Sequence, residues 1–211
     1  MTMFKNTLIS VSAALVLGLS SAGLAQANDP ADAAMQQALA TLDATLPGKL
    51  INNPYDIQWS TDGSDKKESI VKSEGVPGGM AYSVKVKKAK RKPWETATRF
   101  TMTEDIAKDD VILISYWARA AKPQKGRDTG DILVALQRNI EPYDSIIEER
   151  VDLGTEWELH HAAGTAKRDY VAEKTNLNFN LAYAKQTIEF GQFYIMNLGP
   201  GGDASKYMSK D

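Results

Sequence analysis

Residues 176–181 read NLNFNL, and this alternation decides the class of the fold. Leu177, Phe179 and Leu181 point to one side of an extended chain, while the three asparagines point to the other. A period of two residues with one apolar side predicts a β-strand that packs its leucines and phenylalanine on a core. The same strand turns a row of amide groups away from that core.

The same alternation recurs through most of the chain. It predicts nine strands, at residues 56–60, 79–87, 96–103, 111–120, 131–138, 146–152, 156–162, 175–182 and 186–197. Clusters of Gly, Pro, Asn and Asp separate these runs, and no long amphipathic helix lies between them. Short strands with this spacing are typical of an all-β sandwich.

The first 27 residues have the pattern of a cleavable signal peptide. Lys5 precedes an apolar run from Leu8 to Leu19, and residues 25–27 read AQA, a small-x-small cleavage site. The run is shorter than the roughly 20 residues of a membrane-spanning helix. We therefore expect a protein that is secreted or periplasmic and has no membrane span.

The rest of the chain divides into three parts. Residues 28–48 predict an amphipathic helix, with an apolar stripe at Met35, Leu39, Leu42 and Leu46. The helical stretch at 30–46 either packs on the domain surface or docks a protein partner. Residues 49–199 form the predicted sandwich, and the polar residues 200–211 predict a flexible tail.

Composition excludes several kinds of chemistry. The chain has no cysteine, which excludes thiol catalysis, zinc–thiolate sites and iron–sulfur clusters. His160 and His161 are adjacent, so on a strand they point to opposite faces and make no metal site. No G-x-S-x-G sequence supports acyl transfer. The carboxylates between residues 141 and 152 are better explained by a charged surface than by the spaced pair of a glycosidase.

The net charge of −2 gives no general attraction to nucleic acid. Locally, however, residues 85–92 hold six cations in eight positions, directly before Pro93-Trp94. This run is either a solvated strand end or a surface that attracts an acidic polysaccharide. The expected export of the chain favours a polysaccharide over nucleic acid.

Several predicted strands carry polar side chains on the side opposite the core. Arg119, Gln137, Asn178 and Glu189 occupy such positions. Sugar hydroxyls need partners that donate and accept hydrogen bonds, and sugar C–H groups stack on aromatic rings. These residues suit sugar recognition, although polar groups also face water on any half-exposed sheet.

An ordered series of segments resembles one family of modules. The segments are GGMAYSVKV at 78–86, PWE at 93–95, SYWARA at 115–120, Leu136-Gln137, Pro142-Tyr143, Glu156-Trp157, Asp169-Tyr170, LNFNL at 177–181, QTIEFG at 186–191 and Asn197. In this order they resemble the jelly-roll carbohydrate-binding modules of families four, nine and twenty-two, which are often attached to xylanases and cellulases. The resemblance covers residues 50–199.

The resemblance implies a jelly roll whose concave sheet binds a polysaccharide or oligosaccharide without catalysis. It implies that Trp94, Arg119, Gln137 and Glu189 line that sheet, with Tyr143 and Asn178 behind them. It also implies a possible structural calcium, for which no ligands are assigned. The alternative is a structural or protein-interaction jelly roll that does not bind glycans.

Overall fold

The computed structural model describes residues 30–208, so the predicted signal peptide lies outside the described residues. The chain divides into two compact units, and the second begins at Ala38. The boundary falls within helix α1 (Pro30–Asp43), which ends three residues before the predicted stop of the helical stretch at Leu46.

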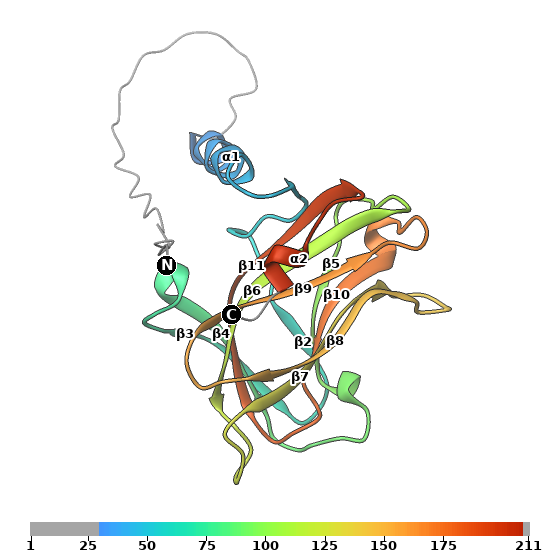
Figure 1. Ribbon diagram of the computed structural model, residues 1–211. Helices are drawn as coiled ribbons and strands as arrows, with labels where there is room; N and C mark the ends of the chain where they lie inside the picture. Colours follow the sequence, from blue (N-terminus) through green and yellow to red (C-terminus); the bar gives the residue numbers. More distant parts are fainter. Residues whose placement is uncertain (1–29, 209–211) are drawn as a thin grey trace, which may run out of the picture. The chain divides into compact units, whose positions relative to one another are not determined.

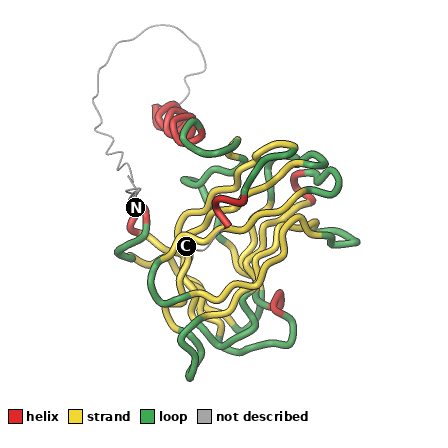
Figure 2. The backbone as a smooth tube through the Cα atoms, viewed as in Figure 1, coloured by secondary structure: helices red, strands yellow, loops and turns green. Residues whose placement is uncertain are grey.

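Two antiparallel sheets make up the second unit (Figures 1 and 2). In the first, named sheet A, the strand order is β3-β4-β11-β6-β9, and β1 pairs with β11. In the second, named sheet B, the order is β2-β5-β10-β7-β8. The strands of sheet A are β1 (Lys49–Leu50), β3 (Lys66–Lys72), β4 (Met80–Val86), β6 (Asp110–Lys122), β9 (Glu158–Thr165) and β11 (Thr187–Pro200). Those of sheet B are β2 (Ser60–Asp62), β5 (Ala97–Thr101), β7 (Gly130–Arg138), β8 (Ser145–Leu153) and β10 (Thr175–Asn180).

Short helical turns connect some of these strands. They are the 3-10 helices η1 (Pro77–Gly79), η2 (Pro93–Glu95) and η3 (Ala172–Lys174); a short C-terminal helix, α2 (Ser205–Met208), follows the last strand. The predicted all-β jelly-roll sandwich with a short N-terminal helix is confirmed. Eight of the nine predicted strands overlap observed strands along most of their length; the ninth, at 56–60, meets β2 only at Ser60.

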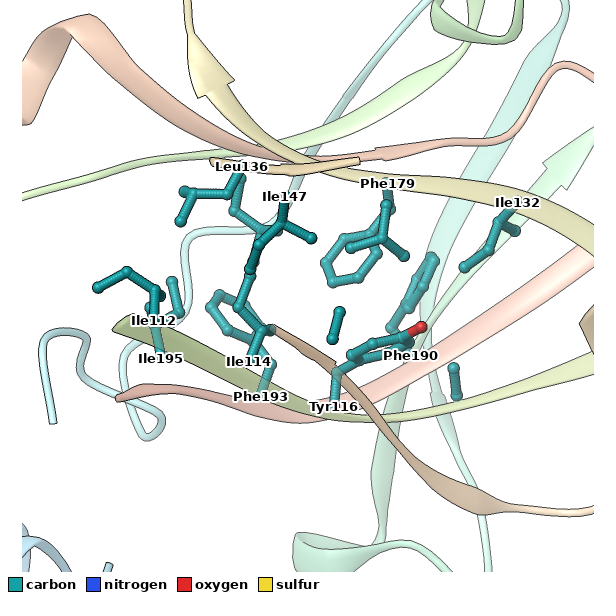
Figure 3. Close-up of a cluster of buried hydrophobic side chains, with 14 of the residues drawn as sticks. Ile112, Ile114, Tyr116, Ile132, Leu136, Ile147, Phe179, Phe190, Phe193 and Ile195 are labelled. Carbon is teal, nitrogen blue, oxygen red and sulfur yellow. The ribbon is translucent and has the colours of Figure 1, made fainter. Parts of the chain in front are cut away.

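The core lies between the two sheets (Figure 3). Ile114, Tyr116 and Phe193 of sheet A face Leu136 and Phe179 of sheet B, and each of these side chains is at most 1% exposed. Burial of apolar side chains from both sheets is the main force that holds a sandwich together. The apolar side chains of residues 176–181 are therefore the contribution of one strand to a core that two sheets share.

Strand β11 keeps its apolar side on the core by means of a bulge. Ile188 and Phe190 are buried, but a strict period of two would then turn Phe193 and Ile195 outward. The register between β11 and β6 shifts between Phe190 and Phe193, and both Phe193 and Ile195 are buried. The extra residue of a bulge changes which side of the strand faces the core.

The C-terminal residues pack on sheet A as far as the structure describes them. Ala204 is buried in a second apolar cluster with Leu113 and Met196, and Tyr207 of α2 packs against the same cluster. The ring of Tyr207 also lies 5.9 Å from that of His161 on β9. Residues 200–208, which the sequence predicts to be a flexible tail, thus contribute a packed segment.

Candidate functional site

A cleft of about 700 Å³ lies on the side of sheet B that faces away from the core. Most of its lining residues are polar, and they come from four of the five strands and the loops beside them. The lining residues are Trp94, Arg99, Leu133, Gln137, Asn139, Tyr143, Glu148, Asn176, Asn178 and Asn180. A volume of this size is in the range of small-molecule and oligosaccharide sites.

A row of three asparagines on β10 runs along the cleft. Asn176, Asn178 and Asn180 alternate with the buried Leu177 and Phe179, so all three point into the cleft. Alternate residues of a strand are about 6.6 Å apart, so the row extends over about 13 Å. The cleft thus offers amide groups at regular intervals along its length.

A second polar row crosses the sheet at Asn178. Strand register places Asn178 opposite Arg99 of β5 on one side and Ala135 of β7 on the other, and Ala135 is opposite Glu148 of β8. Arg99 is paired with Asp62 on β2. A guanidinium and a carboxylate therefore flank the asparagines, and the small side chain of Ala135 keeps the floor between them low.

The amide of Asn178 has an unused acceptor. Asn178 is only 6% exposed, and its Oδ1 has no hydrogen-bond partner among residues 30–208. By contrast, Asn176 Oδ1 accepts a hydrogen bond of 3.2 Å from Asn139, whose amide also donates to the carbonyl of Glu173. A buried amide oxygen without a donor is unfavourable, so Asn178 lowers the stability of the fold at this position.

Trp94 stands at one end of the asparagine row. It lies in η2, which two backbone hydrogen bonds hold beside the end of β10, from Ala182 N to Pro93 O and from Leu181 N to Thr96 O. The indole is 53% exposed, so its ring is accessible for stacking. The Lys92 ammonium lies 5.6 Å from the ring centroid and contributes a cation–π contact.

Tyr143 stands at the other end, in the loop between β7 and β8. Its side chain is 54% exposed, and its backbone adopts a left-handed conformation with φ of 58°. The next residue, Asp144, fixes this loop through the Tyr170 hydroxyl at 2.9 Å and the guanidinium groups of Arg168 and Arg138. The two exposed rings thus occupy the opposite ends of one polar cleft.

The contacts of Asp144 also change the acidity of the groups involved. Burial, together with the hydrogen bond to Asp144, raises the pKa of Tyr170 to about 12. Burial acts to raise the pKa of Asp144, but the Tyr170 hydroxyl and Arg168 outweigh it and lower that pKa below its ordinary value. Near pH 7, the Asp144 carboxylate that holds the Tyr143 loop is therefore ionised, and the Tyr170 hydroxyl bonded to it is neutral.

Four of the six predicted site residues meet in this cleft: Trp94, Gln137, Tyr143 and Asn178. Arg119 and Glu189 do not, because they lie on β6 and β11 of sheet A. There they form an ion pair with N–O distances of 2.8 and 2.9 Å. The alternation of a strand identifies the side of its own sheet on which a residue lies, but not which sheet the strand joins.

The contacts of Arg119 explain why it is structural at this position. Its guanidinium also lies 4.9 Å from the ring of Trp157 and donates to the Ser73 hydroxyl at 3.3 Å. The Trp157 Nε1–H donates to the same hydroxyl at 3.0 Å. Together these groups tie the loop after β3 to the loop before β9.

Sequence reasoning did not assign the other residues of the cleft, which are Arg99, Leu133, Asn139, Glu148, Asn176 and Asn180. The alternation of residues 176–181 does place Asn176 and Asn180 on the same side as Asn178, so the signal for these two is in the sequence. Glu148 carries no such signal, since it becomes part of the cleft only through the pairing of β8 with β7.

Neither a metal cluster nor a membrane-spanning helix is found among residues 30–208. No three His, Asp or Glu side chains in that range lie where they would hold a metal ion together. The predicted structural calcium therefore has no side-chain cluster to fit it and stays a prediction. No helix in the same range is long and apolar enough to cross a membrane.

Comparison with known proteins gives a clear answer for the fold alone. No family model and no curated protein sequence matches the chain. Among solved structures, the CBM22-1 xylan-binding domain from Paenibacillus barcinonensis Xyn10C is 13% identical, with a TM-score of 0.53 over 72% of this chain and 96% of that domain. The fold is that of a carbohydrate-binding module.

Two further structures have this fold at the same low identity. The tandem CBM22-1–CBM22-2 domain from the same Paenibacillus protein matches with a TM-score of 0.53 over 74% of this chain and 48% of that one. An arabinose-bound GH51 α-L-arabinofuranosidase matches with a TM-score of 0.51 over 71% of this chain and 24% of the enzyme. The predicted resemblance to jelly-roll carbohydrate-binding modules is confirmed for the fold, and Trp94, Gln137, Tyr143 and Asn178 line its cleft.

Proposed function

We propose that this carbohydrate-binding-module fold binds a polysaccharide or oligosaccharide in the cleft of sheet B. The observation that carries the proposal is the row of three asparagines on β10, which lines the cleft between the exposed rings of Trp94 and Tyr143. A sugar chain suits both features, because it has hydroxyl groups for the amides and C–H faces for the rings.

The length of the cleft favours a chain of several sugar units over a single sugar. About 13 Å of asparagine row separates the ends at which Trp94 and Tyr143 stand. Affinity should be modest, because an exposed cleft exchanges sugar–water hydrogen bonds for sugar–protein bonds at a small net gain.

The cleft is proposed to bind the glycan without cleaving it. Hydrolysis of a glycosidic bond generally needs two carboxyl groups, one on each side of the bond. Among the described residues that line the cleft, Glu148 is the only acidic one. Arg99 and the amides are suited to bind hydroxyls but not to donate or remove protons at neutral pH.

We place this binding outside the cytoplasm, in the periplasm or after release. The support for this is the signal-peptide pattern of residues 1–27, which precedes the described part of the chain. Glycans of cell walls and surfaces are the partners available in those compartments.

The experiment is an affinity-gel screen against neutral polysaccharides, among them xylan, β-glucan and arabinan, followed by calorimetry on the best ligand. Wild type should be retarded by at least one of them, and Trp94→Ala should weaken binding by about tenfold or more, which corresponds to about 1.4 kcal/mol. Tyr55→Ala is the matched control, since Tyr55 is an exposed aromatic residue (46%) that does not line the cleft.

Two results would count against glycan binding in the cleft of sheet B. One is the absence of retardation by every polysaccharide in the screen. The other is equal weakening by Trp94→Ala and Tyr55→Ala, which would show that the cleft is not the site. The first result would favour the alternative of a structural or protein-interaction jelly roll, and the second would move glycan binding to another surface.

A further inference from the structure

A second concave surface lies at one end of sheet A. It is a pocket of about 550 Å³ whose lining includes four exposed lysines and no acidic residue. The lining residues are Lys85, Val86, Lys122, Pro123, Lys125, Lys185, Gln186 and Thr187. We call it the lysine pocket, and it shares no residue with the cleft of sheet B.

Strand register brings these lysines together from distant parts of the sequence. Thr187 of β11 is opposite Lys85 of β4 on one side and Lys122 of β6 on the other. Lys67 of β3 is in turn opposite Lys85. Directly opposite residues have Cβ atoms about 5 Å apart, and like charges in such positions repel. Three lysines therefore stand in one row across four neighbouring strands.

The protein does not neutralise this row. Among residues 30–208, no carboxylate oxygen lies within 4.0 Å of the ammonium group of any lysine in the pocket or of Lys67. Two nearby lysines do form ion pairs: Lys66 pairs with Glu68 at 2.8 Å, and Lys90 pairs with Asp65. Within the described residues, the lysines of the pocket thus have no ion-pair partner.

The pocket is also held in shape by a buried amide. Gln186 is 2% exposed and makes three hydrogen bonds: it accepts from Asp131 N at 2.8 Å and donates to Asp131 O at 2.7 Å and to Leu181 O at 3.0 Å. These bonds join the start of β7 to the loop between β10 and β11. A site that is formed before the ligand arrives loses less entropy on binding.

From this charge and geometry we propose that the lysine pocket binds an anionic saccharide, that is, a sugar chain with carboxylate or sulfate groups. Ammonium groups attract both anions, and the Thr187 hydroxyl can bond a sugar hydroxyl. The net charge of the whole chain is −2, so the attraction is local to the pocket.

The lining argues against single-stranded nucleic acid and a bilayer surface as partners. Single-stranded nucleic acids are bound largely by stacking of bases on aromatic side chains, and no aromatic residue lines the lysine pocket. Anchoring in a bilayer surface uses large apolar side chains, and the lining offers only Val86, which is buried, and Pro123.

The test compares two double variants that change the net charge equally. Lys85→Gln/Lys122→Gln removes two lysines of the pocket, whereas Lys72→Gln/Lys167→Gln removes two exposed lysines elsewhere. Polygalacturonate supplies carboxylates, dextran sulfate supplies sulfates, and unmodified dextran is the neutral reference. Wild type should bind one or both anionic polymers. The affinity of the pocket variant for them should be lower by about tenfold or more, and the control variant should keep wild-type affinity.

Salt gives a second readout. Raising NaCl from about 50 to about 300 mM should weaken anionic binding strongly and should leave neutral glycan binding through Trp94 nearly unchanged, because salt screens exposed charges. The pocket variant should retain that neutral binding, so failure of one proposal is distinguishable from failure of the other.

Three results would overturn the proposal. The first is equal affinity for dextran and both anionic polymers. The second is an equal loss in the pocket and control variants, which would indicate a general charge effect. The third is binding of single-stranded DNA or of anionic lipid vesicles as tight as that of the anionic polysaccharide, which would exclude recognition of a saccharide.

Discussion

The amide of Asn178 is a single group whose replacement should separate folding from binding. Its Oδ1 is buried without a donor, and leaving such a group unsatisfied costs about 1–3 kcal/mol. A leucine has a similar size and shape and needs no hydrogen-bond partner.

We therefore expect Asn178→Leu to leave the free energy of unfolding unchanged or to raise it by about 1 kcal/mol, while glycan binding weakens by about tenfold. Urea unfolding and affinity gels measure the two effects. A loss of stability of more than about 1 kcal/mol would show that the amide contributes to the fold instead.

Arg119 should behave in the opposite way. Arg119→Ala leaves Glu189, whose side chain is 11% exposed, without its partner and removes the contact with Trp157. We expect a loss of stability of about 2 kcal/mol, below the value for a fully buried pair because the Arg119 side chain is 27% exposed.

Binding of neutral glycans by the folded Arg119 variant should equal that of wild type, since Arg119 lies in sheet A. Calorimetry at a temperature where the variant is fully folded tests this. Weakened binding at that temperature would mean that Arg119 acts on the cleft after all.

At the scale of elements, a glycine allows the strands β8 and β9 to approach closely. A Cβ placed on Gly164 of β9 would lie 2.1 Å from the Ile146 carbonyl oxygen on β8. The two strands belong to different sheets, so this contact joins the sheets at one edge of the sandwich.

Gly164→Ala should therefore destabilise the protein by about 2–3 kcal/mol, because the backbone atoms that it meets cannot turn away as a side chain could. Gly154→Ala is the control, since its nearest neighbour would be the Glu158 Oε1 at 3.7 Å. The control should change stability by less than about 0.5 kcal/mol in urea unfolding. Equal effects of the two substitutions would contradict this account.

The edge strand β3 shows where element prediction from sequence reaches its limit. Residues 66–72 read KKESIVK, and five of the seven are exposed. An edge strand pairs on one side only and here buries little, so its side chains need not alternate. Its position was decided by backbone pairing with β4, which no pattern of side chains records.

For the whole molecule, the predicted export has a direct test. Expression of the full chain in a Gram-negative host, with fractionation and intact-mass measurement, should give a mature protein that begins at Asn28. Replacing Ala27 with a bulky residue should block cleavage and leave the full-length chain. A cytoplasmic protein that retains residues 1–27 would contradict the prediction.

The sequence by itself determined the sandwich, most of its strands and one side of each strand, because alternation of apolar and polar residues is a local property. The asparagine row of β10 could be predicted on this basis, whereas Trp94 and Tyr143 lie outside the strands and were predicted only from the resemblance to carbohydrate-binding modules. The bulge in β11 could not, since it depends on the register with β6.

The tertiary structure alone decided which residues share a surface. Arg119 and Glu189 have the same outward parity as Asn178, yet their strands pair into sheet A, where they bind each other. The basic run at 85–92 is likewise divided: Lys85 joins Lys122 and Lys185 in the lysine pocket, whereas Lys92 lies over Trp94 beside the cleft. Strand pairing between distant segments fixes these surfaces. Each hydrogen-bonded ladder places side chains about 5 Å apart, although tens of residues separate them in the sequence.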